Sequence, residues 1–274
     1  MLDGDRLTAW IALSLIPGMS LRRLRALISH AQGDPRAVFE LTTAALRAVP
    51  GVGERTAAAI RAVDLGALAE RAAGWRARGV EIVTVDHPLY PDPLRRRDGA
   101  PPTLFVRGSL ENCVGGLFSA VEGVALVGTR TPSQAGLSAA RRLAGEAVRR
   151  GWTVISGLAV GIDAAAHIGA LDAGGYTLAV LGCGVLEVYP PQSHALAAQI
   201  LARGGALISE IAPDAPVERA ALVARNRIIA LLSRQVIVVE SQPDGGAMHA
   251  ARFAQSAGIP VIFGHDSALD ALPD

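Results

Sequence analysis

The stretch Ile155-Ser-Gly-Leu-Ala-Val-Gly-Ile-Asp-Ala-Ala-Ala-His167 decides the fold. An apolar segment, residues 152–155, leads into a glycine-rich turn, and the following residues predict a helix that begins near Ile162. Backbone N–H groups at a helix N-terminus have no intrahelical partner and carry a partial positive charge. Since glycines let the backbone approach a ligand closely, this order predicts an anion-binding loop.

The same order of strand, small or glycine-rich turn and helix recurs along the chain. It is found in Gly123-Val-Ala-Leu-Val-Gly-Thr-Arg130, Tyr176-Thr-Leu-Ala-Val-Leu-Gly-Cys-Gly184 and Val236-Ile-Val-Val-Glu-Ser-Gln-Pro-Asp-Gly-Gly246. The alternation predicts strands at 124–128, 152–156, 176–181, 206–209, 235–240 and 260–263, and helices at 133–150, 162–173, 192–203, 217–232 and 246–257. Right-handed crossovers then give an α/β fold, an extended Rossmann-like, doubly wound and mostly parallel sheet whose turns share one edge.

The N-terminal part of the chain has a different pattern. Residues 1–66 predict a small all-α domain with a degenerate repeat, Leu15-Ile-Pro-Gly-Met-Ser-Leu-Arg-Arg-Leu24 and Ala48-Val-Pro-Gly-Val-Gly-Glu-Arg-Thr-Ala57. Each Pro-Gly turn with the arginine after it, Arg22 or Arg55, resembles a helix-hairpin-helix. Such hairpins bind the DNA backbone without reading sequence, but they are also ordinary packing modules, and both interpretations stay open.

A connecting segment links the two parts of the chain. Residues 67–122 predict short strands at 80–85 and 103–106, which extend the main sheet, and a loop or hairpin at 110–122. The Rossmann-like domain then occupies residues 123–274.

Composition excludes several classes of protein. The formal net charge of the 274 residues is +1, so a nucleic-acid site has to be a local arrangement of charge. Every basic residue is arginine, which suits bidentate phosphate contacts and equally reflects a GC-rich coding bias. Cys113 and Cys183 fit neither a disulfide framework nor a metal site, and no secretory signal or membrane-spanning segment is evident, which predicts a cytoplasmic protein without membrane insertion.

A set of ordered motifs carries a family resemblance. They are Val127-Gly-Thr-Arg130, Ser156-Gly-Leu-Ala-Val-Gly-Ile-Asp163 with Ala166-His167, Leu181-Gly-Cys-Gly184 with Tyr189-Pro190, Ser209-Glu210, Arg225-Asn-Arg-Ile-Ile-Ala230 and Val238-Val-Glu240, preceded by Tyr90-Pro91 and Pro101-Pro-Thr-Leu-Phe-Val-Arg-Gly108. With them the chain resembles the DprA/Smf family, DNA-processing protein A.

The resemblance implies a recombination mediator of natural transformation rather than an enzyme. Such a protein binds and protects incoming single-stranded DNA, loads the RecA recombinase onto it, acts as a homodimer and needs no cofactor or metal. Some members of the family add a C-terminal winged helix. The chain stops at Asp274, which leads us to expect a short form without that domain, although an incomplete sequence would look the same.

The glycine turns and the resemblance together predict a DNA-binding set. Its members are Gly128, Thr129, Arg130, Ser156, Gly157, Gly161, Asp163, His167, Gly182, Arg225, Asn226, Arg227, Gly245 and Gly246. Arg130 is the expected central cation, with the backbone amides of Gly128, Gly157, Gly161 and Gly182 beside it. No residue is assigned a catalytic role.

Several members of this set have an equally ordinary structural interpretation. Asp163 suits a cap of backbone N–H groups, and His167 suits a buried hydrogen-bonding role. Arg225 and Arg227, in one predicted helix, point about 200° apart, so one is expected to bind phosphate and the other to pair internally. Glu210 and Glu240 are candidate ion-pair partners for these arginines.

The chain also departs from the family pattern. Ile168 stands where a basic residue often follows the Ala-His pair, Leu222-Val223-Ala224 replaces a Phe-Pro, and Gly245-Gly-Ala-Met-His249 is poor in hydroxyl groups. With only 4% aromatic residues, backbone contacts should dominate over base stacking.

Two rival functions use the same fold. A nucleotide N-glycosidase resembling the lysine-decarboxylase-like phosphoribohydrolases has a glutamate soon after its glycine turn, and Pro243-Asp-Gly-Gly-Ala-Met-His-Ala-Ala251 has none there. A dinucleotide-dependent oxidoreductase needs a third spaced glycine, which Gly182-Cys-Gly184 lacks.

Overall fold

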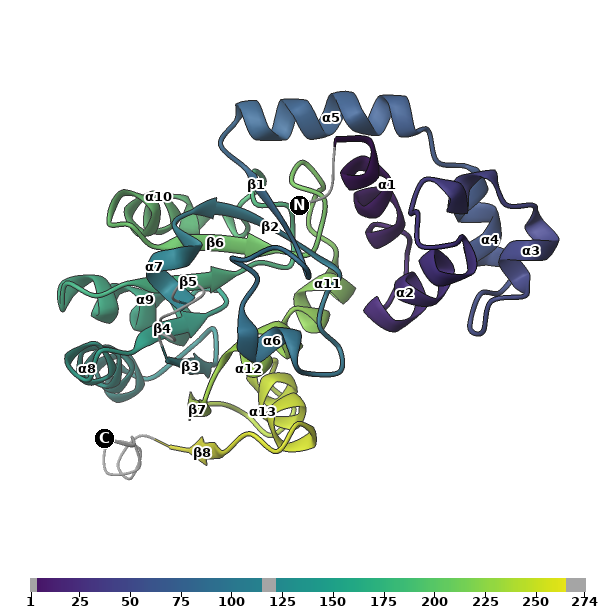
Figure 1. Ribbon diagram of the computed structural model, residues 1–274. Coiled ribbons are helices and arrows are strands. Elements are labelled where there is room, and N and C mark those ends of the chain that lie inside the picture. Colours follow the sequence, from purple (N-terminus) through teal and green to yellow (C-terminus); the bar gives the residue numbers. More distant parts are fainter. Residues whose placement is uncertain (1–3, 115–121, 265–274) are drawn as a thin grey trace.

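In the computed structural model, residues 4–114 and 122–264 are described. Their strands form one eight-stranded sheet in the order β1-β2-β6-β5-β4-β3-β7-β8 (Figure 1). The strands are β1 (Glu81–Thr84), β2 (Thr103–Gly108), β3 (Gly123–Gly128), β4 (Thr153–Ser156), β5 (Thr177–Val180), β6 (Ala206–Ser209), β7 (Gln235–Glu240) and β8 (Val261–Phe263). The six strands from β3 onward pair in parallel, as predicted, and β1 and β2 extend the sheet in antiparallel pairing.

The sheet reverses its direction of growth between β3 and β7. From β3 the chain adds β4, β5 and β6 on one side and then returns to place β7 and β8 on the other. In open α/β sheets a ligand crevice lies at such a switch point, outside the carboxyl ends of the strands. The loops after β3 and β7 therefore flank the position that the fold favours for binding.

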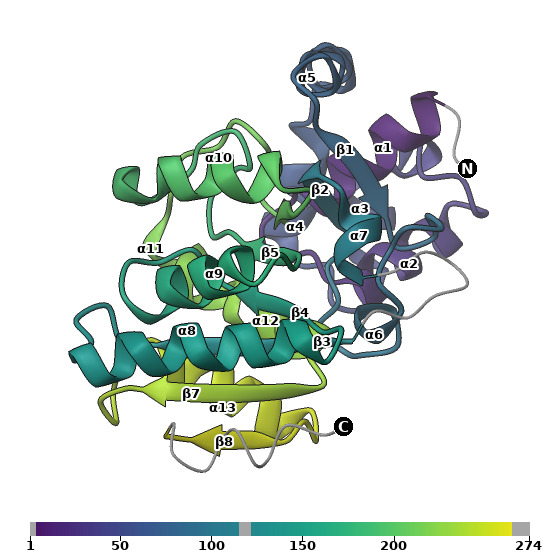
Figure 2. The same cartoon turned by 90° about the vertical axis from the view of Figure 1, so that its left-hand side faces the viewer.

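Helices cover both faces of this sheet. The helices α8 (Gln134–Arg149), α9 (Ile162–Asp172) and α10 (His194–Ala202) lie on one face, with α12 (Asn226–Leu232) and α13 (Ala247–Ser256) on the other (Figure 2). Alternate residues of the strands account for this, since Leu126 packs with α8 and α9 whereas Val127 packs with α12 and α13. A buried apolar layer on each face thus holds the loops at the carboxyl edge in place.

Helices also make up the part of the chain before β1. They are α1 (Gly4–Ser14), α2 (Leu21–His30), α3 (Thr43–Arg47), α4 (Glu54–Arg61), α5 (Leu65–Ala77) and the 3₁₀ turn η1 (Ala37–Glu40). The core of α1 to α4 is continuous with one face of the sheet, because Trp10 and Leu13 belong to the same buried cluster as Val83 and Leu104.

The two predicted Pro-Gly turns both adopt the hairpin geometry. Gly18 joins α1 to α2 with φ 74°, and Gly51 joins α3 to α4 with φ 82°, a left-handed conformation that favours glycine. The Arg23 guanidinium donates to the Gly18 carbonyl oxygen at 2.7 Å and lies beside Gly51. Arg23 therefore links the two hairpins to each other.

Two predicted elements were wrong. The helix expected at 217–232 is two helices, α11 (Arg219–Ala224) and α12, which meet at Arg225. The loop expected at 110–122 begins instead with a short helix, α7 (Leu110–Val114), anchored by buried Leu110 and Cys113, and residues 115–121 lie outside the described ranges. The short elements α6 (Asp92–Arg95) and η2 (Pro191–Ser193) complete the fold.

Candidate nucleic-acid interface at the carboxyl edge of the sheet

Two loops meet where β3 and β4 end. Gly161, with φ 88°, precedes α9 and lies so close to the loop after β3 that a β-carbon there would overlap the Thr129 carbonyl and the Arg130 backbone. The Ile162 amide donates to the Thr129 carbonyl oxygen at 3.2 Å. This contact places exposed Arg130 directly beside the N-terminus of α9.

The loop before α9 has a strained and tightly held backbone. Leu158 has φ 59°, which is uncommon for a residue with a side chain. Its side chain is fully buried, and the Ser193 hydroxyl donates to its carbonyl oxygen at 2.8 Å. Such strain persists only where the surroundings over-determine it, and it clusters at functional sites.

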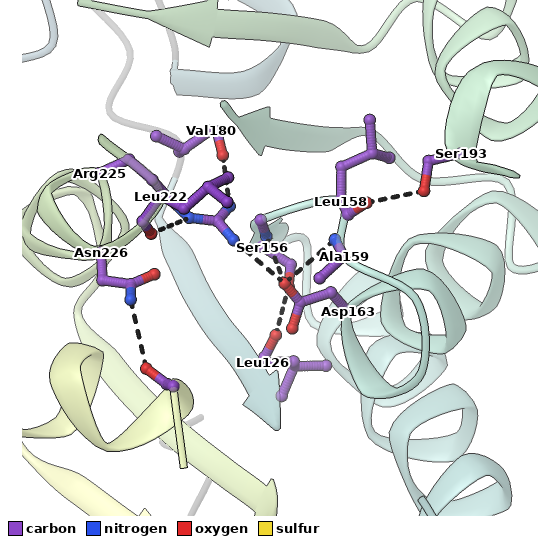
Figure 3. A network of polar contacts seen from close by, with 12 residues as sticks. Leu126, Ser156, Leu158, Ala159, Asp163, Val180, Ser193, Leu222, Arg225 and Asn226 are labelled. Atoms are coloured by element: carbon purple, nitrogen blue, oxygen red, sulfur yellow. Dashed lines mark hydrogen bonds and ion pairs between the residues drawn. The ribbon is translucent and has the colours of Figure 1, made fainter. Parts of the chain in front are cut away.

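A buried ion pair supports this loop from below (Figure 3). The Arg225 guanidinium lies 3.8 Å from the Asp163 carboxylate, and both residues are about 5% exposed. Arg225 also donates to the Val180 carbonyl oxygen at 2.6 Å, and Asp163 accepts from the amides of Gly157 at 3.2 Å and Ala159 at 3.4 Å. Burial raises the pKa of Asp163, while Arg225 and the amide donors oppose this.

The break between α11 and α12 explains how Arg225 reaches the loop. Arg225 turns inward under Gly157, where a β-carbon would overlap its guanidinium. Asp163 therefore binds the preceding loop as well as Arg225. The N-cap residue of α9 is Gly161, so Asp163 holds loop amides instead of capping the helix as expected. Burial also lowers the pKa of Arg225, an effect that Asp163 opposes.

These contacts separate the backbone donors that are engaged from those that are open. The Gly157 amide donates to the Asp163 carboxylate, and the Thr129 amide donates to the Glu240 carbonyl oxygen at 2.7 Å. Within residues 4–114 and 122–264, the amides of Val160 and Gly161 have no acceptor. Val160 and Gly161 are also half-buried rather than fully buried, so their open amides can be reached beside Arg130, and Val160 was not in the predicted set.

The N-terminus of α8, the other helix at the switch point, is already occupied by an anion. The Glu240 carboxylate accepts from the Ser133 amide at 3.1 Å and from the Ser133 hydroxyl at 2.7 Å. A carboxylate in this position satisfies the donors that a nucleotide phosphate would use. Glu240 thus does not pair with Arg225 or Arg227, contrary to the ion pair considered for it.

The other predicted residues lie around this centre in different roles. Ser156 donates to the Leu126 carbonyl oxygen, and Asn226 donates to the Gly246 carbonyl oxygen, which holds the 245–246 turn. The backbone of Leu222 in α11 lies against Gly182. Arg227 pairs with Glu210 at 2.5 Å, which confirms the ion pair considered for these two residues.

His167 is buried below the loop. Its Nδ1 lies 2.7 Å from the Thr177 hydroxyl, and burial lowers its pKa to about 3. The ring is therefore neutral and structural, as the buried interpretation predicted. It offers no charge to an anion at the surface.

An exposed aromatic residue at the same edge was also absent from the predicted set. Tyr189, in the loop after β5, is 37% exposed. Its position in the Tyr-Pro motif was noted, but sequence alone did not distinguish an exposed ring from a buried one.

Residues 81–271 match the family described as DNA recombination-mediator protein A. The chain belongs to this family. It is 40% identical to Protein Smf of Synechocystis over 66% of the chain and 45% of that relative, and 32% identical to DNA processing protein DprA of Bacillus subtilis over 72% of the chain and 65% of that relative. The chain thus spans less than two thirds of these curated members of the DprA/Smf family.

Solved structures of the family share the fold. A structure of DprA from Streptococcus pneumoniae superposes with a TM-score of 0.75 at 24% identity, covering 99% of this chain and 92% of that one. A structure of DprA from Helicobacter pylori, described by its single-stranded DNA binding mode, superposes with a TM-score of 0.57 at 26% identity, covering 67% of this chain and 80% of that one. The Rossmann-like fold expected for this family is confirmed.

Two further observations concern the described residues only. No helix among them combines the length and the apolar character needed to cross a membrane. No three of their His, Cys, Asp or Glu side chains are grouped so that they could hold a metal ion.

Proposed function

We propose that this protein is a single-stranded DNA-binding recombination mediator. The observation that carries the proposal is the meeting of the loops after β3 and β4, which presents the exposed Arg130 guanidinium beside the open amides of Val160 and Gly161. A cation and backbone donors that converge on one point suit a phosphodiester. The structure of the Helicobacter pylori relative, which concerns single-stranded DNA binding, supports the same ligand.

The surrounding charges favour a polymer over a nucleotide cofactor. Glu240 occupies the helix N-terminus at the switch point, so a dinucleotide would find its usual phosphate position filled. Beneath the loop, Arg225 is compensated by Asp163 and is buried, so it holds the loop in shape and leaves Arg130 as the cation at the surface. An extended DNA strand can bind through a few contacts of this kind, between a surface cation or amide and each phosphate.

Family membership supports a mediator role. We propose that the bound strand is protected from nucleases and passed to the RecA recombinase during natural transformation, that two copies of the chain act together, and that no catalytic turnover takes place. The site itself supports binding without chemistry, since its buried His167 and Asp163 are engaged in internal contacts.

Equilibrium binding of the purified protein to labelled single- and double-stranded oligonucleotides, across a salt series, tests the proposal. We expect preference for the single strand, with affinity falling as salt rises by about 0.7 logarithmic units per logarithmic unit of salt for each phosphate contact. Addition of RecA to strands coated with single-strand-binding protein then tests loading. Failure to bind either form at low salt would contradict the proposed function.

A further inference from the structure

A large groove lies away from the interface described above. It has a volume of about 1350 Å³ and is lined mainly by residues of α2, α5, α6, α11 and α12 and of the turns between them. We call it the arginine groove, because each of α2, α5, α6 and α12 contributes at least one arginine to it.

One wall of the arginine groove is the first Pro-Gly hairpin. Residues 14–22 line it continuously, so the turn at Gly18 and the first residues of α2 face the groove. Arg22 and Arg25 of α2 project from this wall, and Arg71 comes from α5. Arg22 is exposed and has no carboxylate partner within the described ranges, whereas Arg25 and Arg71 pair with Asp86 and Asp214.

The facing wall belongs to the sheet side of the molecule. Arg95, Arg96 and Arg97 come from α6 and the turn after it, and Arg227 comes from α12. Arg96 pairs only at the surface with Asp92 at 3.2 Å, and its side chain stays 79% exposed. Arg97 donates to the Ala257 carbonyl oxygen and has no carboxylate partner among the residues that the structure describes. Surface pairs of this kind are weak and exchange readily for a phosphate.

Acidic residues are fewer along the same surface. Asp98, Glu210 and Glu218 line the groove, and Glu210 is already paired with Arg227. In a chain whose overall charge is +1, the local excess of arginine stands out. None of the most exposed large apolar side chains, Tyr176, Tyr189, Val223 and Phe263, lines the groove. Apolar side chains such as Leu15, Met19 and Phe253 also line the groove, so the argument for a polyanion rests on the arginines.

The groove also adjoins the loops of the interface. Ala221 and Ala224 of α11 line it, while the backbone of Leu222 in the same helix lies against Gly182. One short helix therefore separates the groove from the glycine turn after β5. A strand that leaves the edge of the sheet has only α11 to pass before it meets the arginines.

We propose that the arginine groove binds a second segment of the phosphodiester backbone of single-stranded DNA, with Arg22 and Arg96 as phosphate contacts. This inference rests on the proposed function, and it assigns to the first hairpin the DNA contact that the sequence left open. The groove extends the binding site from the sheet to the N-terminal helices. Because the groove contacts the DNA backbone, it increases the affinity and the length of the binding site and adds little sequence preference.

The test compares oligothymidylates of two lengths, about 6 nucleotides, near the lower end of the usual site size of a single-strand binding module, and about 20 nucleotides, beyond its upper end. The double variant Arg22→Ala, Arg96→Ala is expected to bind the longer strand about tenfold more weakly near ~0.1 M salt, with a salt slope lower by about 1.4, because each phosphate contact contributes ~0.7. Binding of the shorter strand should change less than twofold.

Arg55→Ala is the matched control. Arg55 occupies the position of Arg22 in the second hairpin, is exposed, and does not line the groove. It should bind both lengths like the unaltered protein, and melting temperatures should be equal for all variants because the altered side chains lie at the surface.

Three results would overturn the proposal. The double variant could bind the longer strand with the affinity and slope of Arg55→Ala, while the unaltered protein still binds DNA, in which case the proposed function stands and the groove does not. Equal loss for both lengths would place these arginines in the primary site. Unchanged DNA binding with lost stimulation of RecA would assign the groove to an acidic protein partner.

Discussion

Replacing Arg225 by alanine is expected to lower the free energy of unfolding by about 3–5 kcal/mol, because the Asp163 carboxylate is left buried without its partner. The truncation also removes the donor to the Val180 carbonyl oxygen and leaves a void under Gly157. Urea denaturation followed by circular dichroism measures the loss directly.

The double variant Arg225→Ala, Asp163→Asn separates the charge from the packing. Burying a neutral amide costs less free energy than burying an unpaired carboxylate. We therefore expect the double variant to recover part of the stability that is lost in Arg225→Ala. A loss below about 1 kcal/mol in Arg225→Ala would show that the pair does not support the loop.

Replacing Arg130 by alanine is expected to weaken single-strand binding by about 1–3 kcal/mol, which corresponds to roughly 5- to 150-fold. Arg130 is exposed and holds no internal ion pair within the described residues, so the folded state should keep its stability. Fluorescence anisotropy with a labelled oligothymidylate at fixed salt measures the change.

Arg142→Ala is the control for Arg130. Arg142 is exposed on α8, the helix that follows Arg130 in the chain, and its loss changes the net charge by the same amount. If both variants bind like the unaltered protein, Arg130 is not a contact. If both lose affinity equally, the effect is one of overall charge.

The sheet could be predicted almost completely from sequence. Strands such as residues 235–240 are continuous apolar runs, as parallel strands buried on both faces require, and helical segments of ten or more residues separate them. The same regularity located the glycine turns at the carboxyl edge. The division into domains at residues 66 and 122 stays a prediction.

The errors lie where tertiary contacts override local pattern. No sequence pattern within residues 217–232 predicts that the helix breaks at Arg225. The break accompanies the ion pair of Arg225 with Asp163, which is 62 positions earlier in the chain. In the same way, Glu240 binds Ser133 across 107 positions. Partners so far apart leave no spacing signal, so the sequence named most of the residues at the site but not these pairings.

The arginine groove illustrates the same limit. Arg22, Arg71, Arg96 and Arg227 are far apart in the chain and become neighbours of one cavity only after the N-terminal helices pack against the sheet. Each arginine alone has the ordinary interpretation of a solvated surface residue. That they line the same groove becomes visible only in the folded structure.

The central claim is that a phosphodiester binds where the loops after β3 and β4 meet. Titration of isotope-labelled protein with an oligothymidylate, followed by NMR of the backbone amides, tests it most directly. We predict that the amide resonances of Val160 and Gly161 move furthest, as open donors acquire an acceptor, and that Arg130→Ala shifts the titration to higher DNA concentration. If those two amides stay unchanged while saturation occurs elsewhere on the molecule, the interface has been placed wrongly.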